Sequence, residues 1–212
     1  MRLDAYTDDA ICNAMGLGQF EHVGGERAIR LLLKPSFHPE ACVTVEPARL
    51  HVVALRSMLW REPVPCRLLE YAETASLVAD QFDRLIGAFD LALAEDANRG
   101  ELVCLDGMPI SALRIDGDRR WKFGGHPTGS GQSQFVVNLL RLAHASVSSV
   151  HLRNRIAEYG RYLSQAFKIE PEPELPNTAG VLVLGAPDDR ADYFKELQRK
   201  TAAADGPQTK DM

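Results

Sequence analysis

A glycine-rich stretch at residues 125–133, with the sequence GHPTGSGQS, has the spacing of a phosphate-binding loop but lacks its lysine. A working loop reads GxxxxGK[ST]: its backbone amides hold the phosphates, and its lysine reaches the outer ones. Gln132 stands at the lysine position, and His126 stands where the first glycine belongs. The charge on which nucleotide hydrolysis depends is therefore absent, although amides at the start of a helix can still bind an anion.

A basic segment directly before this loop could hold the same anion. Residues 119–122 read RRWK, and cations beside a helix N-terminus favour a negatively charged ligand. On this interpretation the chain is a nucleotide or anion sensor that does not hydrolyse its ligand. The candidate contacts are Gly129, Ser130, Gly131, Ser133, Arg120 and Lys122.

Three loop residues, His38, Asp106 and His126, are the candidates for catalysis. Loops at one end of a sheet can bring together residues that are far apart in the sequence, and these three would then suit a hydrolytic enzyme. Against this, Asp106 precedes a glycine, as tight turns favour, and the chain has no GxSxG nucleophile elbow. We therefore expect a binding protein rather than an enzyme, with hydrolysis as the alternative.

The spacing of cysteine and histidine predicts no metal centre, and no motif indicates a cofactor. The four cysteines, at positions 12, 42, 66 and 104, form no CxxC pair, which argues against a zinc ribbon or a dithiol redox site. His38 and Cys42 have a helical ligand spacing, but Pro39 between them favours a turn. We interpret the cysteines as small buried apolar side chains in a reducing compartment.

Four arginines give the C-terminal helical region a local excess of positive charge: Arg141, Arg153, Arg155 and Arg161. Such a surface could bind an acidic partner protein, although charged helix faces usually serve only solvation. Nucleic acid is not expected as a partner, because no aromatic cluster accompanies these arginines and no groove-reading motif is present.

The composition is that of an ordinary globular protein. The chain has 212 residues, of which 45% are hydrophobic and 25% charged, and its formal net charge is -5. These values fit one domain with a substantial core. The N-terminal residues include early acids and no apolar run, so we expect neither a secretory signal nor a membrane span, and a cytoplasmic location.

The first half of the chain is predicted to form three strands followed by a long helix. A short helix at residues 7–15 precedes strands at 28–33, 41–46 and 50–56, which prolines separate. Apolar residues at helical spacing then predict a helix over 74–97.

The second half repeats this order. Strands are expected at 101–105, 110–115 and 119–123, because the Asp-Gly pairs between them are strong hairpin signals. A helical stretch from Ser133 to about residue 167 is too long for a domain of this size. We therefore expect it to break at 146–149, where the sequence SVSS has low helix propensity.

The C-terminal part is expected to be a separate strand and helix behind a stiff connector rich in proline and glutamate. The fold class predicted is α+β, with two antiparallel three-strand meanders each followed by a long helix (βββα-βββα), plus this C-terminal β-α unit. The predicted segments are the N-terminal segment 1–27, the main domain 28–168, the linker 169–177, the C-terminal unit 178–200 and a disordered tail 201–212.

Residues 29–39 (IRLLLKPSFHP), followed after a long helix by Leu105-Asp106-Gly107, resemble a group of small uncharacterised bacterial α+β proteins. Those proteins share a strand ending in a Ser-Phe-His-Pro-like turn and a later strand ending in Leu-Asp-Gly. The likeness covers about half the chain, roughly residues 28–127, and it implies no activity. Members commonly carry an aromatic residue and an acid on the strand that follows, whereas this chain has Ile110, Ser111 and Arg114 there.

The leading functional hypothesis is a protein-binding protein of the bacterial cytoplasm, such as an immunity, adaptor or defence-associated component. It depends on the lack of an assembled catalytic set and on sheet edges that can receive a partner. The sequence also leaves open whether the chain forms a homo-oligomer.

Overall fold

The computed structural model describes residues 6–59, 70–96 and 107–171. Six strands form one antiparallel sheet in the order β4-β3-β2-β1-β5-β6. The strands are β1 (Arg27–Leu33), β2 (Ala41–Glu46), β3 (Arg49–Leu55), β4 (Glu70–Ser76), β5 (Ile110–Asp116) and β6 (Arg119–Gly125). The helices described are α1 (Asp8–Ala14), α2 (Ala79–Asp96), α3 (Ser130–Ser146) and α4 (Val150–Arg161).

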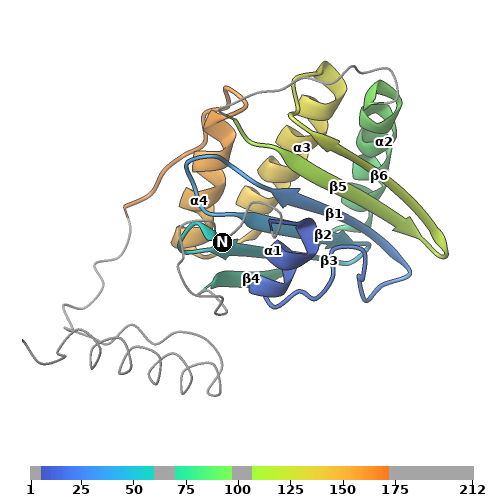
Figure 1. The fold of residues 1–212 in the computed structure, drawn as a ribbon, viewed down its shortest axis with the longest axis horizontal. Helices are drawn as coiled ribbons and strands as arrows, with labels where there is room; N and C mark the ends of the chain where they lie inside the picture. Colours follow the sequence, from blue (N-terminus) through green and yellow to red (C-terminus); the bar gives the residue numbers. More distant parts are fainter. Residues whose placement is uncertain (1–5, 60–69, 97–106, 172–212) are drawn as a thin grey trace, which may run out of the picture.

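The sheet lies between two unequal layers. Figure 1 shows α2, α3 and α4 together on one face and the short helix α1 on the other. Side chains alternate between the faces along each strand: Val43 and Val45 of β2 join the core under the large helices, while Cys42 points to the side of α1. Both faces are thus buried over much of β1 and β2, which explains their nearly continuous apolar sequences.

The large core contains three phenylalanines that join different elements. Phe89 of α2 and Phe123 of β6 have ring centroids 5.0 Å apart, and Phe135 of α3 lies 5.5 Å from Phe89. Aromatic pairs at these separations add to the stabilisation from apolar burial. They fix α2 and α3 against the β5–β6 end of the sheet.

The predicted α+β class is confirmed, but the βββα-βββα order is not. Four of the described strands precede α2, and β1 pairs with both β2 and β5, so that the two groups of strands form one sheet. The helix expected from residue 74 begins at Ala79 instead, and β4 ends at Ser76. Ala72, Glu73 and Ala75 favour a helix locally, but pairing with β3 outweighs that preference. The strand expected at 101–105 lies outside the described residues.

The predicted break in the C-terminal helical region is confirmed. Helix α3 ends at Ser146, Val147 is extended at φ -83° and ψ 142°, and the Ser149 side chain accepts the N–H of Leu152 to begin α4. The predicted ends are wrong: α3 begins at Ser130, after the N-cap Gly129, rather than at Ser133, and α4 ends at Arg161 instead of continuing to 167. Ser133 instead directs its hydroxyl to the carbonyl of Pro127.

The described part of the N-terminal segment, from residue 6, packs against the sheet. Thr7 caps α1 by accepting the N–H of Ala10 at 3.2 Å, as serine and threonine commonly do. Ile11, Cys12 and Met15 are buried against the sheet face opposite the large helices. The helix expected at 7–15 is thus confirmed, and it covers one part of that face.

Of the C-terminal predictions, only the beginning of the connector falls within the described residues. The unit at 178–200 and the tail at 201–212 lie outside them. Among the described helices, none has the length and apolar character needed to cross a membrane.

Candidate functional site

The glycine-rich loop holds an anionic group that belongs to the chain itself. The carboxylate of Glu95, in the last turn of α2, accepts the backbone N–H of Gln132 at 2.9 Å in the first turn of α3. The Gln132 side chain, which stands at the lysine position of a phosphate-binding loop, is buried and donates to Asp96 at 2.8 Å. Gln132 therefore ties α3 to the end of α2.

The same carboxylate explains why positions 129 and 131 of this loop are glycines. A Cβ atom at Gly129 would lie 2.3 Å from the Glu95 side chain, and one at Gly131 would lie 3.2 Å from it. An external phosphate at the start of α3 would have to displace Glu95, because both negative groups need the same backbone donors. The basic residues before the loop are also engaged: Lys122 pairs with Glu21, and Arg120 donates to the carbonyl of Asp118.

The structure describes two of the three candidate catalytic residues, His38 and His126. Asp106 lies outside the described residues. His38 contacts the Tyr162 hydroxyl through Nδ1 at 2.8 Å, and burial lowers the pKa of its imidazole. His126 follows β6, whose last residue, Gly125, is paired with Ile110. No carboxylate is within hydrogen-bonding distance of the His38 ring in the described part of the chain.

The loops themselves do meet at one end of the sheet. Leu33, at the end of β1, pairs with Ile110 at the start of β5. The N–H of Ser36 donates to the carbonyl of Gly107 at 2.9 Å, and the Ser36 hydroxyl accepts the N–H of Gly107 at 3.1 Å. The turn before His38 thus lies against the residue that follows Asp106.

Most of the arginines expected to face a partner are engaged within the chain. Arg153 forms an ion pair with Glu170 at 2.9 Å, and Arg155 forms one with Glu158 at 2.6 Å. Arg141 donates to the Gln165 side chain at 2.8 Å. The contacts of Arg141 and Arg153 secure residues 165–170 against α3 and α4, whereas the Arg155–Glu158 pair lies within α4.

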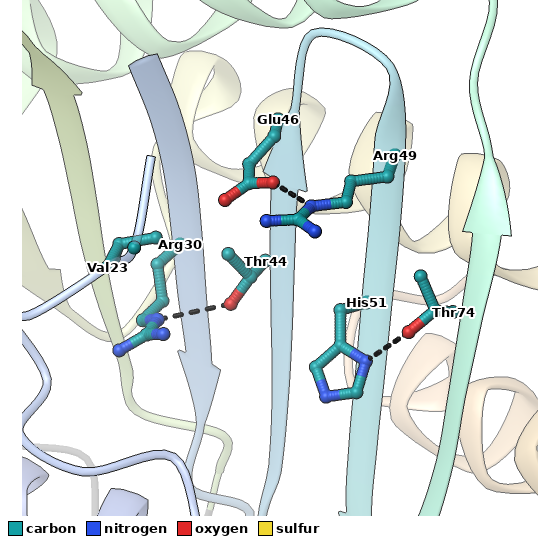
Figure 2. Close-up of a pocket in the computed structure, with 8 residues that line it drawn as sticks. Val23, Arg30, Thr44, Glu46, Arg49, His51 and Thr74 are labelled. Carbon is teal, nitrogen blue, oxygen red and sulfur yellow. Dashed lines mark hydrogen bonds and ion pairs between the residues drawn. The ribbon is translucent and has the colours of Figure 1, made fainter. Parts of the chain in front are cut away.

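A polar row that the sequence did not reveal crosses the sheet face that α1 covers only in part. Arg30 of β1 pairs in register with Thr44 of β2, Thr44 with His51 of β3, and His51 with Thr74 of β4. Residues directly opposite each other on neighbouring strands point to the same face, and Figure 2 shows the four side chains along this row. Four adjacent strands thus place one polar side chain each in a line.

Arg30 is the most constrained member of the row. It is only 4% exposed. Its Nε donates to the Thr44 hydroxyl at 3.1 Å, and Nη1 donates to the carbonyls of Phe20 at 3.0 Å and Gln19 at 3.2 Å. The segment after α1 therefore fixes the guanidinium group in one orientation.

The other members of the row line a pocket of about 280 Å³. The His51 imidazole contacts the Thr74 hydroxyl through Nδ1 at 2.8 Å, and Arg49 is paired with Glu46 at the β2–β3 hairpin. Burial lowers the pKa of His51, a hydrogen bond to the Glu73 backbone partly opposes this, and the nearby charges of Arg30 and Arg49 lower the pKa further. The lining residues are Val23, Gly24, Arg30, Thr44, Glu46, Arg49, His51 and Thr74.

The polar groups of this pocket are mostly hydrogen-bond donors. It offers guanidinium, hydroxyl and imidazole donors, and its only carboxylate among the lining residues is bound to an arginine. The part of the chain that the structure describes contains no cluster of histidine, cysteine and acidic residues that could hold a metal ion. The sequence signal for the site was slight: Arg30 and His51 each interrupt an otherwise apolar strand, but only the register brings them together.

The comparisons with known proteins leave the family open. No family model matches the chain, and no curated protein matches it significantly.

Proposed function

We propose that the chain is a protein-binding protein that receives an extended segment of its partner along the edge of β4. The observation that carries this proposal is the position of β4: it is the last strand of the sheet, and β3 is its only neighbour among the described strands. Extended peptides commonly bind by adding a strand to such an edge. An immunity, adaptor or defence-associated component of the bacterial cytoplasm would use an edge in this way.

The backbone groups available on β4 follow from its pairing. The N–H of Leu77 donates to the carbonyl of Ala48, next to β3. Because the direction of the backbone groups alternates along an antiparallel strand, Ala75, Glu73 and Tyr71 also point to β3. Ala72 and Thr74 then direct their N–H and C=O groups away from the sheet, where a partner strand would pair with them.

Contacts on the helical side hold β4 in place. The Glu73 carboxylate accepts the N–H of Ser148 at 2.6 Å and of Ser149 at 2.9 Å, before α4. The Tyr71 ring stacks on His151 with centroids 4.8 Å apart, and the Arg56 guanidinium lies 4.3 Å from the Tyr71 ring centroid. A strand that is already ordered loses little conformational entropy when a partner binds.

The two edges of the sheet differ in their protection against pairing. Strand β6 carries Arg119, Arg120 and Lys122, and charged side chains of this kind discourage edge-to-edge association. Strand β4, with the sequence EYAETAS, contains neither a basic residue nor a proline. Its charged residues are Glu70 and Glu73, and the Glu73 carboxylate is engaged by Ser148 and Ser149 on the helical side. This contrast supports β4 as the edge that takes a partner.

The test is affinity purification of the tagged protein from its own host, with wild type compared with Ala72→Pro and Ala72→Ser. Proline removes the outward N–H of residue 72 without breaking a bond to β3, since proline is tolerated on edge strands. Serine keeps that N–H and is the matched control. We expect a stoichiometric partner with wild type and Ala72→Ser and its loss with Ala72→Pro. No partner with wild type, or equal recovery with Ala72→Pro, would contradict the proposal.

A hydrolytic enzyme that uses His38, Asp106 and His126 is a second proposal, supported by the paired hydrogen bonds between Ser36 and Gly107. Its test is complementation of a deletion strain with the triple alanine variant. Full complementation would remove this proposal and leave the binding function intact.

A further inference from the structure

The buried charge of Arg30 has no counter-ion in the described part of the chain. Its hydrogen-bond acceptors are the Thr44 hydroxyl and the carbonyls of Gln19, Phe20 and His22, all of which are neutral. Within residues 6–59, 70–96 and 107–171, no carboxylate pairs with it, and Nη2 donates to no acceptor. A buried charge is costly unless it is paired, so the pocket in front of Arg30 is suited to an anion.

The charges around the pocket determine which anion fits. Arg30 and Arg49 carry two positive charges, and Glu46 carries one negative charge. His51 is not expected to add charge at neutral pH, because burial and the two arginines lower its pKa. The pocket therefore has a formal charge of +1, which a single carboxylate neutralises. A phosphate dianion would exceed this charge and would also face Glu46.

Two further side chains of the pocket, Thr44 and His51, can donate hydrogen bonds to a carboxylate. The Thr44 hydroxyl accepts from Arg30 Nε and, among the described residues, otherwise has a polar contact only with the Cys42 sulfur, at 4.0 Å, a weak contact that its proton can exchange for a bond to a ligand. The His51 ring contacts the Thr74 hydroxyl through Nδ1 and also bonds the Glu73 backbone. In the tautomer in which the Thr74 hydroxyl donates to Nδ1, the ring proton is on Nε2. Charge-assisted hydrogen bonds from arginine to carboxylate are among the strongest in proteins.

We propose that the pocket formed by Arg30, Thr44, Arg49 and His51 binds one carboxylate group, carried by a small free acid or by an acidic side chain of a peptide. The volume of about 280 Å³ lies near the lower end of small-ligand sites and fits a compact group. This site goes beyond the proposed function, because the pocket can bind a free acid whether or not a partner pairs with β4.

The test is an NMR titration that follows the Arg30 Nε–H and the His51 side chain. The probes are propionate as a free acid and N-acetyl-aspartate α-amide as a peptide carboxylate. N-acetyl-asparagine amide, sodium chloride and sodium phosphate serve as controls at equal ionic strength. Both carboxylates should produce saturable shifts in the millimolar range, at about tenfold lower concentration than chloride. The tighter of the two probes identifies the source of the carboxylate.

Two variants that change the pocket charge in opposite directions strengthen the test. Both keep Arg30, which also holds the segment after α1. Arg49→Gln removes one positive charge and should weaken carboxylate binding about tenfold, whereas Glu46→Gln should tighten it. Arg84→Gln is the matched control, because Arg84 is an exposed arginine in an ion pair with Asp80 on α2. Shifts that are absent up to about 50 mM, tighter binding of phosphate, or equal effects of Arg49→Gln and Arg84→Gln would overturn the proposal.

Discussion

The Glu95 carboxylate lies at the N-terminus of α3, where it accepts the backbone N–H of Gln132 at 2.9 Å. Unpaired N–H groups and the helix dipole make this position favourable for a negative charge. The helix begins without a side-chain cap from Gly129 itself, so Glu95 supplies the cap from another helix. The glycine-rich loop at residues 125–133 thus brings the start of α3 into hydrogen-bonding contact with the end of α2.

Gly129→Ala is predicted to destabilise the protein through Glu95. The new Cβ would lie 2.3 Å from that carboxylate, and the flexible Glu95 side chain would move away and lose its bond to α3. We expect the free energy of unfolding to fall by about 1 kcal/mol, the usual value of a helix cap. Urea denaturation monitored by circular dichroism measures this change.

A double-mutant cycle separates this cause from a general effect of alanine. In the Glu95→Ala background the contact is gone, so Gly129→Ala should cost almost nothing there. Gly87→Ala is the control, since a Cβ at Gly87 within α2 meets no atom within 4 Å, and it should stabilise by about 0.5–1 kcal/mol. Equal costs of Gly129→Ala in both backgrounds would contradict the role of Glu95.

The sequence predicted the elements whose signals are local. The Asp-Gly pair before Asp118 correctly predicted the β5–β6 hairpin, and the serines at 148 and 149 marked the break between α3 and α4. Turn chemistry and helix propensity act within a few residues, so a single sequence contains the information.

Elements and sites that depend on distant pairing were missed. The last three residues of β4 fall within the helix predicted over 74–97, and pairing with β3 makes them a strand instead. Arg30, Thr44 and His51 form one row only because β1, β2 and β3 pair in one register. A shift by one residue would move His51 to the opposite face. The short turn between Glu46 and Arg49 fixes the β2–β3 register locally, but the register of β1 on β2 and of β3 on β4 depends on residues farther apart.

Glu73→Gln is predicted to destabilise the start of α4. Partial burial opposes ionisation of Glu73, but hydrogen bonds from Ser148 and Ser149 outweigh it and lower the pKa of the carboxyl. A lowered native pKa means that this stabilisation is complete above the ordinary carboxyl pKa and is lost as pH falls through the native one. At neutral pH we expect a loss of about 1 kcal/mol, measured by urea denaturation.

The pH dependence distinguishes this cap from a general packing effect. The difference in unfolding free energy between wild type and Glu73→Gln should shrink as pH falls through the native pKa of Glu73. Asp80→Asn removes an exposed carboxylate from an ion pair with Arg84 and should cost at most about 0.5 kcal/mol. A constant difference at all pH values would argue against the cap.

Glu40 should make the protein less stable as the pH rises. Glu40 is 0% exposed, and burial raises the pKa of its carboxyl, although hydrogen bonds from Leu59 N–H and the Tyr6 hydroxyl partly oppose this. A raised native pKa means that the native state keeps a proton that the unfolded state has released. The unfolding free energy therefore falls as pH rises from the ordinary carboxyl pKa through the native pKa.

Glu40→Gln removes this slope, because the amide does not ionise. The stability of wild type minus that of Glu40→Gln should decrease with pH in that interval, as measured by thermal unfolding in a series of buffers. Tyr6→Phe deletes a hydroxyl that donates to the Glu40 carboxylate at 2.5 Å, so it should shift the interval to higher pH. Parallel stability curves for wild type and Glu40→Gln would show that the carboxyl titrates alike in both states.

Cys12 and Cys42 are predicted to be protected from thiol reagents by α1. They are 0% and 1% exposed and lie in the cluster between α1 and the sheet. Because Cys66 and Cys104 lie outside the described residues, the experiment uses a variant in which both are serine. In the native protein, Cys12 and Cys42 should then react with a disulfide reagent only when α1 opens locally. Immediate labelling of either thiol under native conditions would contradict the burial.

The rate of labelling should depend on the helix cap. Thr7→Ala removes the acceptor for the N–H of Ala10 and weakens α1 by about 1 kcal/mol, which corresponds to roughly fivefold faster opening and labelling. Asn13→Ala is the control, because Asn13 is exposed on the same helix and its replacement should not speed labelling. If both variants label at the wild-type rate, the thiols are reached by global unfolding, and α1 opens only with the rest of the sheet.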